Sequence, residues 1–204
     1  RWKDVIAIGQ QKGDNADDIQ EKKRFLKKVA TLWVDYLSNP AKAAEPLEQI
    51  LEIDPTDREV INSLKDIYEK RRNWMGMYEL KLKELELMPD EEQLSALVSL
   101  ADFAQSPLNN LRLAIETWNR VLERDPHDLD ALDKLLFLYE REKRYPALVE
   151  MLRRKISLSM DDEALPLLEK AGSLLTDKMD SMGPLSMEIW QQVHTLQPGH
   201  PKAL

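Results

Sequence analysis

Apolar side chains recur at every third or fourth position through most of the chain, which is the spacing of a helix with one buried face. Within residues 57–71, Ile61, Leu64 and Tyr68 fall on one side of such a helix. No stretch alternates apolar and polar residues with the β-branched enrichment of a strand. The pattern therefore predicts an all-α fold. The predicted helices cover residues 1–11, 16–38, 41–53, 57–71, 74–87, 90–105, 108–124, 128–142, 145–158, 161–179 and 184–196.

Aspartates and prolines mark the boundaries between these helices. Pro55 and Pro126 each follow an aspartate where one helix ends and the next begins. Asp57 and Asp128 are predicted N-caps, because a carboxylate there accepts hydrogen bonds from the free N–H groups of the first turn. The polar stretch 13–18 reads as a lengthened inter-helix turn, which is favoured over a calcium loop because the required glycine and glutamate spacing is absent.

A long internal repeat organises the helices. Residues 111–132 (LRLAIETWNRVLERDPHDLDAL) align with residues 183–204 (GPLSMEIWQQVHTLQPGHPKAL), which places Trp118 on Trp190, 72 positions later. A third copy of this segment occupies residues 43–55. Because tryptophan, proline and acidic positions share one offset, chance apolar periodicity does not explain the match. Repeats of this kind are typical of helical solenoids.

A second series has the same period. Trp2, Trp74 and Tyr145 lie 72 and 71 positions apart. Each unit of 71–72 residues divides further, since Pro55 and Pro89 are separated by 34 residues, the length of a tetratricopeptide repeat. The unit therefore predicts two helical hairpins, one short and one extended.

The short hairpins resemble the tetratricopeptide repeat (TPR) superfamily in their core positions. The matching residues are Ile61, Leu64, Tyr68, Trp74, Met77, Leu85 and Pro89 in one copy, and Leu132, Leu135, Tyr139, Tyr145, Leu148 and Ile156 in the next. The family's small first-helix residue is replaced by Lys65 and Leu136, and Glu84 and Lys155 stand at an alanine position of the second helix. These departures predict altered helix crossing within the same fold. The alternation of short and extended repeats is similar to long bacterial TPR arrays.

The resemblance implies a right-handed superhelical solenoid of antiparallel helix pairs, with residues 1–204 forming a single domain. Residues 1–11 read as the second helix of a hairpin, and residues 201–204 as the opening of another first helix. Because open ends of a repeat array expose an apolar face, we expect the array to continue in a longer protein or to pack end to end with a copy of itself.

Composition narrows the functional classes. The chain carries 29 Lys and Arg against 37 Asp and Glu, a net charge of −8, which argues against a general nucleic-acid binder. It has no cysteine, which excludes disulfides, thiolate metal sites and a cysteine nucleophile. No apolar run is long enough for a membrane helix. A soluble protein is expected, with the cytoplasm slightly favoured over a periplasm.

No residue pattern predicts catalysis, a cofactor or a metal. His194 is expected at the edge of the core, and its spacing from His200 matches no zinc motif. Phosphate-binding glycine loops and serine nucleophile elbows are absent. The tryptophans are predicted to pack in the core, Trp118 and Trp190 in second helices and Trp2 and Trp74 at hairpin turns. Basic clusters such as 22–28 are interpreted as solvated helix faces. Because no cluster of residues is left over for chemistry, a binding protein is favoured over an enzyme.

The first helix of each TPR hairpin lines a concave groove, which implies a partner site on this chain. The candidate residues lie off the core stripe: Glu59, Asn62, Asp66, Glu69, Ser95, Ser99, Asp102, Asp130, Asp133, Phe137 and Glu140. Most are acidic, and Phe137 supplies an apolar anchor, so the groove is expected to bind a basic or amphipathic segment of another protein.

Two alternative functions are a docking or regulatory domain of a larger enzyme and a self-assembling unit. Loops at 38–40, 105–110 and 180–184 recur at equivalent positions and are either neutral or a second binding edge.

Overall fold

The structure, a computed structural model, describes residues 1–179 and 183–203. Its described part is helical and contains no strand, which confirms the predicted all-α fold. The helices are α1 (Trp2–Asp14), α2 (Ile19–Thr31), the π-helical turn η1 (Leu32–Tyr36), α3 (Pro40–Ile53), α4 (Arg58–Lys70), α5 (Trp74–Glu86), α6 (Asp90–Gln105), α7 (Leu111–Arg124), α8 (Leu129–Arg141), α9 (Tyr145–Leu158), α10 (Asp161–Asp177) and α11 (Pro184–Leu196).

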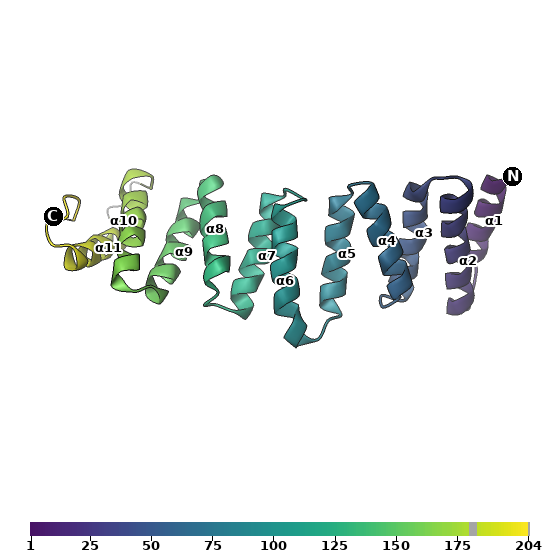
Figure 1. Cartoon of the computed structure of the whole chain (residues 1–204), viewed down its shortest axis with the longest axis horizontal. Coiled ribbons are helices and arrows are strands. Elements are labelled where there is room, and N and C mark those ends of the chain that lie inside the picture. Colours follow the sequence, from purple (N-terminus) through teal and green to yellow (C-terminus); the bar gives the residue numbers. More distant parts are fainter. Residues whose placement is uncertain (180–182, 204) are drawn as a thin grey trace. The chain divides into compact units, whose positions relative to one another are not determined.

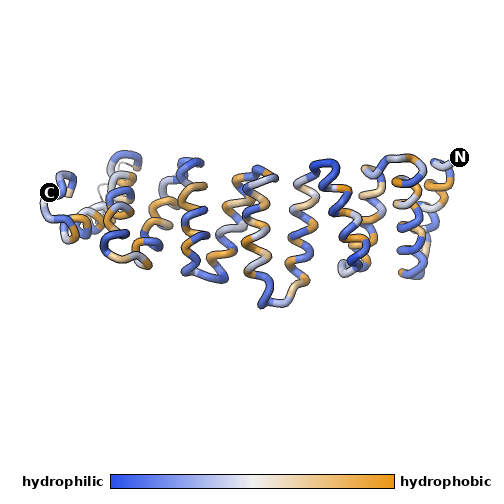
Figure 2. The backbone as a smooth tube through the Cα atoms, viewed as in Figure 1, coloured by the Kyte–Doolittle hydropathy of each residue, from blue (hydrophilic) through white to orange (hydrophobic). Residues whose placement is uncertain are grey.

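The chain divides into two compact units, residues 1–93 and residues 94–204. In the first unit α1 to α5 pack as consecutive neighbours, and in the second unit α7 to α11 do the same. Successive helices within each unit run in opposite directions (Figure 1). Apolar and polar residues are interspersed along the helices (Figure 2), as expected where one face of each helix is buried. Each unit is thus an array of antiparallel helix pairs. The single domain and the right-handed superhelix stay predictions.

One inter-helix turn occurs in three near-identical copies. The backbone N–H groups of Asp54, Asp125 and Gln197 each donate to the carbonyl four residues earlier at 2.8 Å. Their φ angles, −135°, −128° and −133°, agree within a few degrees. After the first two turns, the side chains of Asp57 and Asp128 accept from the N–H groups three residues on, at 3.3 and 3.0 Å. Both predicted N-caps and the 71–72 residue period are therefore confirmed.

The turns inside the hairpins repeat as well. Arg72 and Lys143, 71 positions apart, both adopt a left-handed backbone with φ of 52° and 54°. In each case the next residue's N–H donates to the carbonyl five residues back, at 2.8 Å for Asn73 and 2.9 Å for Arg144. This bond pattern closes the first helix of the hairpin with a left-handed residue, a position that usually holds glycine. Ser38 and Asn109 form a second left-handed pair with the same offset.

Small first-helix residues mark the extended units. Ala30, Ala101 and Gly172 lie at intervals of 71 and are all buried. A Cβ atom at Gly172 would approach the Trp190 indole to 2.6 Å, so the absence of a side chain lets α11 pack directly on α10. From the sequence, this position is identified only in the short units, where Lys65 and Leu136 stand in place of the family's small residue. The small residue is present in the extended units instead.

The tryptophans are less uniformly buried than expected. Trp118 has no exposed surface, which confirms its predicted core position. Trp190 and Trp74 are only partly buried, and Trp2 is 44% exposed, with its ring centroid 4.2 Å from that of Tyr36. The core prediction was therefore wrong for Trp2. Its α1 is the first helix of the first unit and packs mainly on α2 and η1, with a hydrogen bond from Gln10 to Gln49 of α3.

Three predicted helix boundaries were also wrong. The first helix extends to Asp14 because Gly13 is buried against α2. A Cβ atom added to Gly13 would lie 3.6 Å from the Leu26 side chain, and this close packing outweighs the low helix propensity of glycine. The predicted 16–38 helix ends as the π-helical turn η1, and the predicted 108–124 helix begins at Leu111 because Asn110 caps it. The predicted loop at 180–184 includes residues 180–182, which lie outside the described residues.

The left-handed turn makes a stability prediction. A non-glycine residue in this conformation costs roughly 1–2 kcal/mol, so Lys143→Gly should raise the free energy of unfolding by about 0.5–1 kcal/mol after the entropy cost of glycine. Urea denaturation followed by circular dichroism measures the change. Arg141→Gly, two residues earlier and still helical, is the control and should destabilise by a similar amount. Destabilisation by both variants would contradict the role assigned to Lys143.

Because the two aligned tryptophans are buried to different extents, replacing each with alanine should lower the free energy of unfolding by different amounts. Trp118→Ala should lower the free energy of unfolding by about 3–5 kcal/mol, the range for a large buried side chain. Trp190→Ala should cost about half as much, because its ring is only partly removed from water. Thermal and urea unfolding of both variants test this order, and equal losses would show that the two positions are equivalent after all.

Candidate functional site

The eight residues predicted to carry partner binding are all exposed. They come from three first helices, α4, α6 and α8. Asn62, Asp66 and Glu69 belong to the first compact unit. The second unit contributes Ser99, Asp102, Asp133, Phe137 and Glu140. Each unit is therefore considered as a separate candidate surface.

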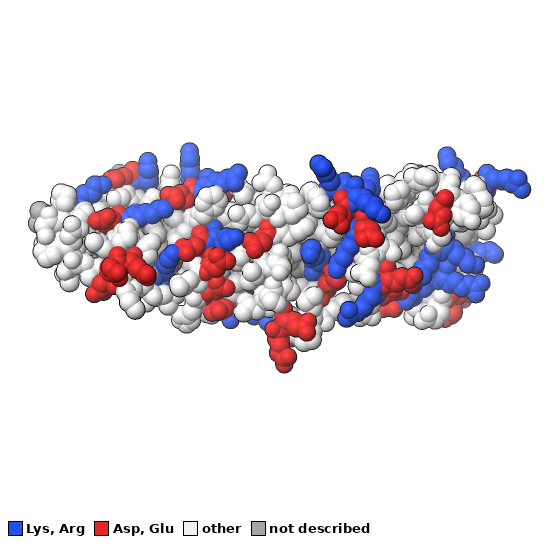
Figure 3. All heavy atoms as spheres, viewed as in Figure 1, with Lys and Arg blue, Asp and Glu red and all other residues white. Residues whose placement is uncertain are grey.

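In the second unit, lysines neutralise the predicted acidic surface. Asp102 pairs with Lys134 at 3.0 Å, and Glu140 pairs with Lys170 at 2.8 Å. Asp133 pairs with Lys155 of α9. Acidic and basic side chains accordingly lie next to one another over α8 and α10 (Figure 3). The partners of these three carboxylates come from neighbouring helices, 22 to 32 positions away in sequence, which reduces the local excess of negative charge. The acidic groove itself stays a prediction.

Phe137 remains a feature of this surface. It is 56% exposed and lies four residues after Asp133 and three before Glu140, on the same side of α8. A large exposed ring between two ion pairs can contact an apolar side chain without breaking either pair. Ser99, by contrast, donates its hydroxyl hydrogen to the Ser95 carbonyl at 3.0 Å, so its donor is used within α6.

In the first unit, the structure contains a groove between the first helices α2 and α4. Its volume is about 410 Å³. The apolar part of the lining comprises Ala30, Val34, Pro40, Leu47, Val60 and Ile67, and the polar part comprises Lys27, Thr31, Asp35, Glu59, Ser63, Asp66 and Lys70. Asp66 and Glu59 are the sequence candidates that the structure brings into it, whereas Asn62 and Glu69 lie outside the lining.

A carboxylate–lysine cluster closes one end of this groove. Lys23 contacts Asp54 at 2.6 Å and Asp57 at 3.0 Å, and Lys27 contacts Asp57 at 3.3 Å and Glu59 at 2.5 Å. Hydrogen bonds to Asp54 raise the pKa of Lys23, and the bond to Glu59 raises that of Lys27. Both lysines are therefore charged at neutral pH.

The two aspartates of this cluster are acidified for related reasons. The hydrogen bond from Lys23 lowers the pKa of Asp54 below its usual range. Burial acts to raise the pKa of Asp57, but the bonds from Lys23, the Val60 N–H and Lys27 outweigh it and the pKa is lowered. The cluster thus fixes the start of α4 against α2.

Sequence reasoning missed most of the groove. Val34 and Asp35 lie in η1, where the π-helical hydrogen bond from the Leu37 N–H to the Leu32 carbonyl changes which side chains face α4. An α-helical wheel drawn through this segment therefore assigns them to the wrong faces. Val34 is 42% exposed in the structure, and no pattern in the sequence pointed to this segment.

The histidines form no metal centre in the described part of the chain, where no group of three or more potential ligands occurs. His200 lies 3.0 Å from Glu169 and stacks on Trp190 with ring centroids 5.7 Å apart. His194 is exposed, so its predicted place at the core edge was wrong. Within residues 1–179 and 183–203, no helix is long and apolar enough to cross a membrane.

No protein-family model and no curated protein matches the chain. Solved structures similar to it include the TPR protein YrrB, with 14% identity, a TM-score of 0.41 and coverage of 97% of this chain and 95% of YrrB. MamA follows with 19% identity, a TM-score of 0.42 and coverage of 89% and 94%. PilF of Pseudomonas aeruginosa has 15% identity, a TM-score of 0.40 and coverage of 98% and 93%. Because all three TM-scores are below 0.5, the fold assignment rests on the helices, turns and repeats described above.

Proposed function

We propose that this chain is a protein-interaction scaffold that holds a segment of another protein in the groove between α2 and α4. Arrays of helical hairpins present extended surfaces to partners without any reactive group. The observation that carries the proposal is the lining of this groove, in which an apolar floor adjoins the carboxylates of Asp35 and Asp66. Such a combination suits an amphipathic partner.

The charges of the groove favour a basic residue in that partner. Glu59 is already paired with Lys27, whereas Asp35 and Asp66 form no ion pair within residues 1–179 and 183–203. The groove lining contains two cations, Lys27 and Lys70. Lys27 is paired with Glu59, whereas Lys70 forms no ion pair among the described residues. A lysine or arginine of the partner can therefore approach Asp66 while its apolar face covers Val34 and Ile67.

Binding is expected to depend on Asp66 more than on its neighbour Glu69. The probe is a synthetic amphipathic peptide of about 15 residues, long enough to form a helix, with leucines on one face and lysines beside them. Asp66→Lys should weaken its binding about fivefold at low salt, since a favourable charge pair becomes a repulsive one. Isothermal titration calorimetry gives the affinity.

Glu69→Lys is the matched control, because it makes the same charge change one turn later on α4 but outside the groove lining. It should leave the affinity within about twofold. Equal losses in the two variants would mean that the peptide senses only net charge. Val34→Ser should also weaken binding by removing part of the apolar floor. An unchanged affinity in both Asp66→Lys and Val34→Ser would refute this groove as the site.

A further inference from the structure

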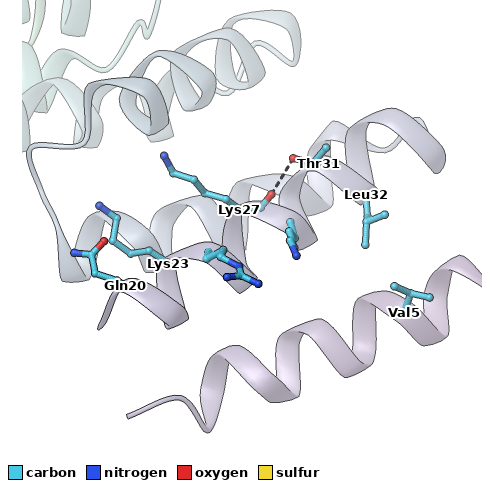
Figure 4. Close-up of a pocket in the computed structure, with 8 residues that line it drawn as sticks. Val5, Gln20, Lys23, Lys27, Thr31 and Leu32 are labelled. Carbon is cyan, nitrogen blue, oxygen red and sulfur yellow. Dashed lines mark hydrogen bonds between the residues drawn. The ribbon is translucent and has the colours of Figure 1, made fainter. Parts of the chain in front are cut away.

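A second pocket lies along α2 where it meets α1, next to the α2–α4 groove, with which it shares Lys27 and Thr31. Val5 of α1 lies opposite Leu32, whereas Lys23 and Lys27 project from α2 on the side away from α1 (Figure 4). The pocket has a volume of about 640 Å³. Four of its eight lining residues are cationic, namely Lys23, Arg24, Lys27 and Lys28, and none is acidic. In a chain with a net charge of −8, this is a local reversal of sign.

Two of these cations form no ion pair with the described residues. Lys23 and Lys27 are engaged by Asp54, Asp57 and Glu59. Arg24 and Lys28 are exposed and form no ion pair among the residues that the structure describes. They lie one turn apart on α2, so their side chains point to the same side of the helix. Lysine and arginine side chains gather over this helix in Figure 3.

The chain itself shows what such cations bind. In each compact unit, a lysine on one first helix pairs with a carboxylate on the neighbouring first helix. The pairs are Lys27 of α2 with Glu59 of α4, Lys134 of α8 with Asp102 of α6, and Lys170 of α10 with Glu140 of α8. Three examples make this a recurring mode of helix-to-helix docking. Lys27 of α2 already forms such a pair with α4, whereas no described carboxylate pairs with Arg24 or Lys28.

The floor of the pocket adds an apolar contact. Val5 is 46% exposed on α1, and Leu32 is partly buried at the start of η1. Both belong to the pocket lining, so an apolar side chain placed there contacts both helices. A ligand that satisfies the whole pocket must then carry apolar groups on one face and carboxylates beside them. A free small anion would meet the cations only.

We propose that the α1–α2 pocket binds an acidic amphipathic helix of a partner protein. Its apolar face packs on Val5 and Leu32, and its carboxylates pair with Arg24 and Lys28. The partner thereby adds a helix beside α2 in the manner of α4. The pocket shares Lys27 and Thr31 with the α2–α4 groove, but Val5, Arg24, Lys28 and Leu32, on which this proposal rests, line only the pocket. The two sites have opposite charge preferences, so either can hold without the other.

The test uses two synthetic peptides of about 15 residues, each with one leucine face. One carries glutamates beside that face and the other carries lysines at the same positions. Fluorescence anisotropy is measured with the wild-type chain at low and physiological salt. The glutamate peptide should bind, with an affinity that falls as salt rises. Arg24→Glu combined with Lys28→Glu should weaken its binding roughly tenfold.

Arg112→Glu combined with Arg141→Glu is the matched control, because it changes the net charge equally at exposed positions in the second unit. It should leave the affinity for the glutamate peptide unchanged. Circular dichroism of each variant establishes that it is folded, and Val5→Asp provides an independent variant directed at the apolar floor.

Three outcomes would overturn the proposal. The first is equal loss of binding in the test and control double variants. The second is equal binding of inorganic phosphate and the glutamate peptide in competition, which would indicate an anion site without a helix. The third is concentration-dependent self-association in sedimentation that is abolished by the Arg24→Glu and Lys28→Glu changes, which would make a second copy of this chain the occupant.

Discussion

The structure depends on the fact that a single helical hairpin cannot bury its own apolar face. Each inner helix of the first unit contacts the helix before it and the helix after it, as α3 contacts α2 and α4. The same holds for α9 between α8 and α10 in the second unit. Burial is therefore shared between neighbours, and stability is expected to accumulate as a series of adjacent interfaces. The residue at each interface, such as Trp118 or Leu135, is buried because two helices cover it.

This arrangement explains why so much of the fold was predictable. Helix limits follow from local signals, for example an aspartate that accepts from N–H groups three residues on, and such signals lie within one turn of the boundary they set. Where a prediction failed, a more distant residue had intervened. Gly13 stays helical because α2 packs over it, and Trp2 is exposed because no helix covers its outer side in the described structure. Neither fact can be obtained from the immediate sequence neighbourhood.

The candidate site was less predictable, because charge on a helical array is distributed between helices. Asp133 and Glu140 belong to one helix, and counting that helix alone suggests an acidic surface. Their lysine partners lie on α9 and α10, so the surface is close to neutral once the helices pack. The reverse applies to α2, which is strongly basic as an isolated segment and shares two of its lysines with acidic residues of the α3–α4 turn and α4. Local composition thus indicates which residues are exposed, but their effective charge is set by the neighbouring helix.

The identical turns at Asp54 and Asp125 have an evolutionary consequence. Both positions end a second helix with the same hydrogen bond and nearly the same backbone angles. A genetic crossover that joins the chain at one of these points to the other would delete or duplicate one unit of 71 residues without creating a new junction geometry. Arrays of different length can therefore arise from this sequence by unequal recombination, while every remaining turn keeps its native hydrogen bond.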